Sequence, residues 1–112
     1  MIAWVTKLFL LLCGHAIADF ALQTEWIAKH KNRHNKSTPP TGQKQQSVWA
    51  YVLTAHSLIH GLMVYLVTSR TDIALAETAI HWITDFGKCE NWYGIHADQC
   101  VHISCKILWS FL

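Results

Sequence analysis

Four short apolar segments of this 112-residue chain each carry a pair of polar side chains spaced four residues apart. The pairs are His15 with Asp19, His56 with His60, His81 with Asp85, and Asp98 with His102. A four-residue step places both side chains of a pair on one face of a helix, one turn apart. Four helices that aim such pairs inward would enclose a polar, metal-sized cluster in an apolar bundle. The sequence therefore predicts an all-α fold in which the pairs meet.

The low charge content favours a membrane environment over water. Charged residues make up 14% of the chain, whereas soluble domains carry about 25%. Residues 47–69 contain no Asp, Glu, Lys or Arg, and about 20 apolar residues suffice to cross a bilayer. Residues 2–26 are a second candidate span. They also resemble a secretory signal, but the helical pattern continues to His30 and argues against cleavage.

We expect a single helical domain over residues 1–112, folded as a membrane-embedded four-helix bundle. The third and fourth helices reach only about 25 and 22 Å at 1.5 Å per residue, short for a full crossing. A soluble di-metal bundle remains an alternative because the mean hydropathy is only +0.18. The predicted helices cover about residues 3–29, 47–69, 72–88 and 98–112, with a polar linker at 31–46 that contains Pro39 and Pro40.

The linker between the first two predicted helices is basic. Under the positive-inside rule it is cytoplasmic, which puts both termini on the opposite side of the membrane. A solvated linker of a soluble protein would carry the same residues. The net charge of the whole chain is only +2, so we expect the lipid bilayer as a partner and no nucleic acid. The basic residues in and beside the linker are Lys29, Lys31, Arg33, Lys36 and Lys44.

The polar pairs need stabilising partners inside apolar helices. An Asp at the centre of a membrane helix costs about 2.5–3.5 kcal/mol on insertion scales, so it is expected to be paired, hydrated or metal-bound. Asp19, Asp85 and Asp98 together carry a charge of −3, which two divalent cations would roughly offset. We therefore predict two divalent ions, held by all eight members of the pairs: His15, Asp19, His56, His60, His81, Asp85, Asp98 and His102.

The donor types limit the choice of metal without excluding metal-free interpretations. Mixed oxygen and nitrogen donors favour zinc, with manganese and iron as alternatives. A hydrogen-bonded His–Asp network that fixes helix register would use the same residues without metal. A path for protons or other ions is a third interpretation of His and Asp inside a membrane.

Two lysines near the pairs indicate hydrolysis. Lys88 follows Asp85 by three residues and Lys106 follows His102 by four. Both could neutralise the charge that develops when a metal-activated water attacks an ester or phosphoester, although lysines also snorkel to the membrane interface. A lipid or lipid-linked phosphate is the expected substrate because the site lies at membrane depth. The predicted catalytic residues are Lys88, Lys106 and Asp98.

The cysteines give a weaker signal. Cys13, Cys89, Cys100 and Cys105 form no CxxC pair, which argues against a disulfide framework or zinc ribbon. Cys89, His96 and Cys100 could bind a metal. Free thiols are the favoured interpretation.

The combined motifs resemble a known family. They are H-x3-D at residues 15–19, H-x3-H at 56–60, H-x3-D-x2-K at 81–88 and D-Q-x2-H-x3-K at 98–106. In this combination the chain is similar to the domain of unknown function 3307 family of small bacterial and phage membrane proteins. The resemblance covers nearly the whole chain. It implies a small multi-pass protein of the bacterial inner membrane, and it supplies no activity.

The general plan is also similar, more distantly, to membrane-bound metal-dependent hydrolases with intramembrane His and Asp residues. We therefore expect a metal-dependent hydrolase of lipid or lipid-linked esters or phosphoesters. The alternatives are a non-catalytic phage or bacterial membrane protein that acts on host membrane partners, and a small proton- or ion-conducting bundle.

Overall fold

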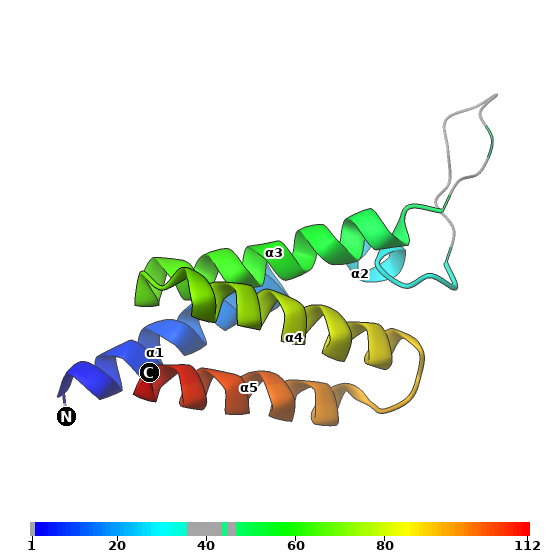
Figure 1. The fold of residues 1–112 in the computed structure, drawn as a ribbon. Coiled ribbons are helices and arrows are strands. Elements are labelled where there is room, and N and C mark those ends of the chain that lie inside the picture. The colour runs from blue at the N-terminus through cyan, green and yellow to red at the C-terminus, as the bar shows by residue number, and fades with distance from the viewer. Residues whose placement is uncertain (1, 36–43, 45–46) are drawn as a thin grey trace.

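The computed structural model describes residues 2–35, 44 and 47–112, and every regular element in them is helical (Figure 1). Most of the predicted linker, including Pro39 and Pro40, lies outside the described residues. The elements are α1 (Ile2–Ala16), the π-helical turn η1 (Ile17–Ala21), α2 (Glu25–His30), α3 (Trp49–Thr68), α4 (Thr71–Cys89) and α5 (Ile95–Phe111).

The three later helices lie close to their predicted positions, but the first one does not. The helix expected at residues 3–29 changes from α1 to a π-helical turn, in which the Leu22 amide donates to the Ile17 carbonyl (2.8 Å), and it is interrupted at residues 22–24. A new N-cap then begins α2, since the Thr24 hydroxyl accepts from the Ile27 amide (3.2 Å). The chain therefore changes direction between the first span and the linker.

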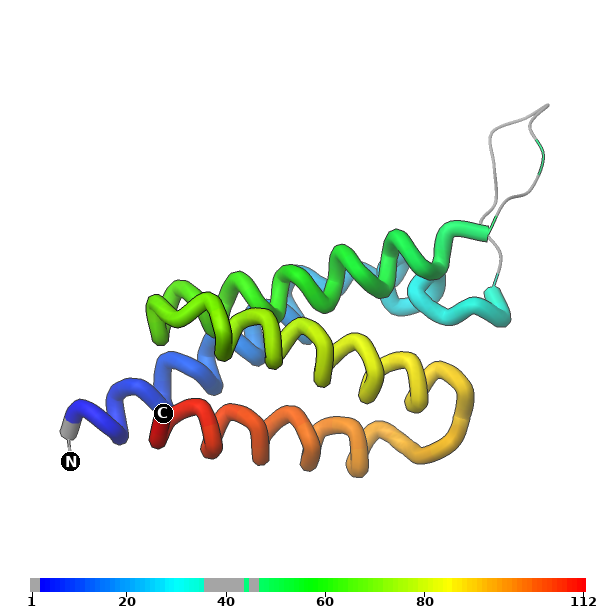
Figure 2. Tube along the Cα trace, viewed as in Figure 1, coloured from blue at the N-terminus to red at the C-terminus, as the bar shows by residue number. Residues whose placement is uncertain are grey.

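Successive long helices run antiparallel, and the two chain ends lie near each other (Figure 2). α3 packs along α4, while α1 packs against α3 and α5. Trp4 donates to the Ser110 hydroxyl (2.9 Å), and Arg70 in the α3–α4 turn donates to the Leu112 carbonyl (2.9 Å). At the opposite end, Asn32 donates to the carbonyl of Cys89 (3.2 Å). The termini and the α3–α4 turn thus share one end, here called the terminal end, and the start of the linker shares the other, the linker end.

The polarity of the molecule is inverted relative to a soluble protein. Among the described residues, 8 hydrophobic and 15 polar or charged residues are buried. The hydrophobic core reduces to one small cluster of Leu11, Val64, Ile73 and Trp109. The outer surface is apolar: Phe9, for example, is 63% exposed. Two helical stretches, Ala3–Ala21 and Trp49–Thr68, are long and apolar enough to cross a membrane.

Gly61 is required where α3 meets α4. A Cβ atom at this position would lie 2.0 Å from the Thr78 hydroxyl and 3.0 Å from the Ala74 carbonyl. We expect Gly61→Val to lower the free energy of unfolding by about 1–3 kcal/mol, because the packed helices must separate. Thermal unfolding in mild detergent measures the change. Gly94→Val is the control, since a Cβ there meets nothing within 4 Å; an equal loss in both variants would contradict the packing argument.

Candidate metal centre

All eight predicted ligands are brought into one buried cluster. Each is at most 8% exposed, and six of them are only 1% exposed. They come from α1, η1, α3, α4 and α5, so the cluster joins every long helix of the molecule. The spacing of the pairs therefore placed them on the inward faces of their helices.

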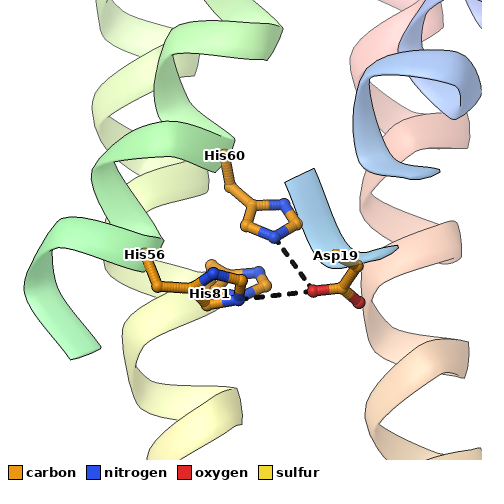
Figure 3. Close-up of side chains that lie close together, drawn as sticks. All are labelled: Asp19, His56, His60 and His81. Atoms are coloured by element: carbon orange, nitrogen blue, oxygen red, sulfur yellow. Dashed lines mark hydrogen bonds and ion pairs between the residues drawn. The ribbon is translucent and has the colours of Figure 1, made fainter. Parts of the chain in front are cut away.

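Asp19 points toward the imidazoles of His56, His60 and His81 (Figure 3). Its Oδ1 lies 3.0 Å from His60 Nε2 and 3.3 Å from His56 Nε2, both on α3. Its Oδ2 accepts a hydrogen bond from the Gln99 amide on α5 (2.8 Å) and lies 3.6 Å from His15 Nε2. One carboxylate thus connects three segments of the fold.

The π-helical turn carries Asp19. Single π turns inside α-helices are rare and occur frequently at functional sites, because the extra residue re-aims the side chains around it. His15 lies just before this turn and bonds to Gln99 through Nε2 (2.9 Å). Both members of the first pair therefore reach the cluster although the helix between them is not a regular α-helix.

Asp85 is surrounded by lysines as well as by imidazoles. Its Oδ2 accepts from Lys31 Nζ (2.7 Å) and lies 3.7 Å from the Nε2 atoms of both His56 and His81. Its Oδ1 lies 3.2 Å from Lys88 Nζ. Lys31 is only 3% exposed, so its ammonium group is folded into the interior from the start of the linker. The interaction of Asp85 with lysine leaves this carboxylate neutralised.

Asp98 and His102 form the fourth pair on α5. Asp98 Oδ1 lies 3.2 Å from His102 Nε2, and its Oδ2 accepts from the Gln99 amide at 3.3 Å. Lys88 Nζ lies 3.7 Å from the same Oδ2 and is 24% exposed in its side chain. Lys88 therefore stands between two carboxylates at the edge of the cluster, where the interior meets the surroundings.

The imidazole rings form a continuous stack. The ring centroids of His60 and His81 are 3.6 Å apart, and those of His81 and His102 are 4.2 Å apart. Within the part of the chain that the structure describes, several buried ring nitrogens have no hydrogen-bond partner. They are Nδ1 of His15, His60 and His102, and both ring nitrogens of His56 and His81. Buried polar atoms without partners are costly, so these nitrogens are available to bind an ion, a water or another ligand.

A second buried ion pair continues the polar interior toward the terminal end. Glu77 Oε1 accepts from Lys106 Nζ, and its Oε2 accepts from the Trp109 indole (2.7 Å). Both charged residues are 1% exposed. Lys106, predicted from sequence to neutralise charge in a reaction, is therefore already paired, whereas Lys88 faces the cluster.

Two groups of donor atoms are close enough to share a metal ion. In each group the donor atoms all lie within 4.8 Å of one another: Asp19, His56, His60 and His81 form the first group, and Glu77, His81 and His102 the second. Four zinc ligands at about 2.1 Å from the ion lie roughly 3.4 Å apart. The Asp19 contacts to His56 and His60 already match this spacing. The second group is less suitable because Lys106 and Trp109 already bond its carboxylate.

Sequence reasoning missed the inward role of Lys31. In the sequence this residue is one of several linker cations, and nothing in its neighbours distinguishes it. The only available signal was its position one residue after a helix end and shortly before Arg33 and His34, which bind the end of α4. Arg33 and His34 both pair with Glu90 at the end of α4 and hold the pKa of Glu90 below its ordinary value. This clamp keeps Lys31 against Asp85. No disulfide bond joins the four cysteines.

Comparison with known proteins places the chain in a family. The model of the family described as "Protein of unknown function (DUF3307)" matches residues 7–112. The chain belongs to the DUF3307 family. None of the curated proteins and none of the solved structures matches it. The resemblance inferred from the four motifs is thereby confirmed, and the function must be argued from the site.

The Glu77–Lys106 pair yields a stability prediction. Glu77→Ala leaves a buried ammonium without its partner, so we expect a loss of about 3–5 kcal/mol in the free energy of unfolding. Replacing both residues, as Glu77→Leu with Lys106→Met, removes both charges and should recover most of that loss. Denaturant unfolding in detergent micelles measures both variants. If the double variant is no more stable than Glu77→Ala, the loss in Glu77→Ala does not come from the unpaired ammonium of Lys106 alone.

Proposed function

We propose that the chain is a multi-pass inner-membrane protein built as a four-helix bundle, with its linker in the cytoplasm. The inverted polarity supports this, because an exposed apolar surface and a buried polar interior are stable in lipid and unfavourable in water. Aromatic side chains near the linker end also suit a membrane interface: Trp82 stacks on Phe86, with ring centroids 5.4 Å apart, and Trp49 and Trp92 lie beside them.

This topology predicts the side of each chain end. Alkaline phosphatase fused after Leu112 should be active in a bacterial host, and green fluorescent protein at the same position should be dark, because the terminal end faces away from the cytoplasm. Fusions after Asn35 should give the reverse pattern. Fluorescent fusions at Leu112 would contradict the assigned orientation. Release of the unfused chain from the membrane fraction by carbonate washing would contradict membrane insertion itself.

We propose further that one divalent transition metal ion, most readily zinc, binds Asp19, His56, His60 and His81. The observation that carries this is the charge balance around Asp19. Four buried carboxylates are present (Asp19, Asp85, Asp98 and Glu77), and three lysines pair with all of them except Asp19. Among the described residues, Asp19 has only imidazole and amide partners. The four carboxylates and three lysines leave a charge of −1, so one divalent ion at Asp19 comes closer to neutrality than the two ions expected from the sequence.

The proposed activity is hydrolysis of an ester or phosphoester in a lipid or lipid-linked molecule. A divalent ion at this position would supply a Lewis acid that activates water at neutral pH. Lys88, partly exposed between Asp85 and Asp98, is placed to stabilise negative charge on a substrate that enters from the linker end. Asp98 orients Lys88 and His102. Lys106 contributes through its pair with Glu77 and does not face a substrate.

Metal content tests the proposal directly. Protein purified in mild detergent should contain one transition metal ion per chain by plasma mass spectrometry and should release fatty acid or phosphate from membrane lipids. His56→Ala with His60→Ala should lose both properties, because two of the four ligands are removed. His96→Ala is the matched control, since His96 is exposed and outside the cluster. Absence of stoichiometric metal would overturn the site, and metal without hydrolysis would overturn the activity alone.

One observation favours a second candidate, a proton path. The buried titratable groups form a continuous series from Lys31 and Asp85 through the stacked imidazoles to Glu77 and Lys106. Such series carry protons in membrane proteins. Metal-free protein that conducts protons in liposomes, with the flux lost in Asp19→Asn, would favour this candidate over the hydrolase.

A further inference from the structure

An apolar groove leads from the outer surface to the candidate metal centre. It lies between α2 and α3 and has a volume of about 320 Å³. Its wall is formed almost entirely by apolar atoms, with a single residue of the metal group, His56, among them. The lining residues are Trp26, Ile27, Tyr51, Val52, Ala55, His56 and Ile59. His56 thus belongs both to the cluster and to this groove.

A second pocket is lined by Glu25, Trp26, Lys29 and His30, so Trp26 belongs to the lining of both the pocket and the groove. Lys29 brings a cation, and Glu25 brings an opposing carboxylate. The surface therefore offers an apolar channel and a charged recess side by side, which matches the two ends of an amphiphile.

His56 has unused hydrogen-bonding capacity at this place. The residue is 1% exposed, and its Nδ1 has no hydrogen-bond partner among the described residues. Its Nε2 faces Asp19 at 3.3 Å (Figure 3). A histidine that binds a metal through one nitrogen normally donates its other N–H to an oxygen. An oxygen that accepted from His56 Nδ1 would orient the ring from the side opposite the metal ion.

We propose that the groove binds one acyl chain of a membrane glycerophospholipid, with the phosphate near Lys29. This assignment rests on the proposed function and names its substrate class. The linker-end aromatic residues place the groove close to the membrane interface, where lipid esters lie. In the reaction, the oxygen of one water bonds to the ester carbonyl carbon and the carbon–oxygen bond to glycerol breaks. A fatty acid and a lysophospholipid with a free hydroxyl are the products.

Photolabelling of the full-length protein in vesicles tests the groove. Phosphatidylglycerol with a diazirine on its acyl chain is the label, and digestion with mass spectrometry locates the cross-links. We expect the labels to concentrate on Tyr51, Ala55 and Ile59, and to fall when unlabelled phosphatidylglycerol is added in excess. Labels spread evenly over exposed apolar residues such as Phe9 and Leu66 would overturn the proposal, because they would report only bulk lipid.

A matched pair of variants separates the groove from the metal site. Ala55→Trp fills the groove from an exposed position on α3, and Ala79→Trp adds the same side chain at an exposed position of α4 outside it. Ala55→Trp should lose the concentrated label and keep one metal ion per chain, whereas Ala79→Trp should keep both. Concentrated label in protein that lacks metal would support the groove and refute the metal site. Evenly spread label in protein that contains metal would support the metal site and refute the groove. Retained label in folded Ala55→Trp would overturn the groove.

Discussion

The buried carboxylate of Asp19 is the contact on which the arrangement of helices depends. Its two oxygens reach imidazoles of α3 and an amide of α5, while its backbone belongs to η1. Apolar packing contributes little to this arrangement, because the hydrophobic core is a small cluster near the terminal end. In lipid, apolar side chains gain nothing by leaving the membrane for the protein interior, so polar contacts and close packing must supply the specificity.

The sequence predicted the cluster better than the path of the chain. The i,i+4 pairs on α3, α4 and α5 were enough to place their side chains inward, since helical periodicity fixes which face a residue occupies. No Pro or Gly in the π turn or at residues 22–24 marks the break in the first predicted helix. The inward fold of Lys31 depends on contacts of Asn32 and Arg33 with the end of α4, which are distant in sequence. Local patterns carry no information on such contacts.

The buried lysines change the electrostatics of the cluster more than any other feature of the structure. Counting carboxylates alone leads to two divalent ions, because three acidic residues need compensation. Lys31, Lys88 and Lys106 neutralise most of the acidic groups without metal. A further ion beside Asp85 would meet an ammonium group at 2.7 Å from the carboxylate oxygen and would be repelled. The place for a cation is thereby restricted to the surroundings of Asp19.

The cluster is also asymmetric along the bundle, and this bears on how a reaction could proceed. At the terminal end, Glu77 and Lys106 are closed off by Trp109. At the linker end, Lys88 is partly exposed and the groove reaches His56 from the outer surface. Within the described residues, the cluster is therefore open toward the linker end and is reached from the side by the groove. The hydrolase that we propose would use the first route for water and polar products and the second for an acyl chain, whereas a purely structural cluster would need neither.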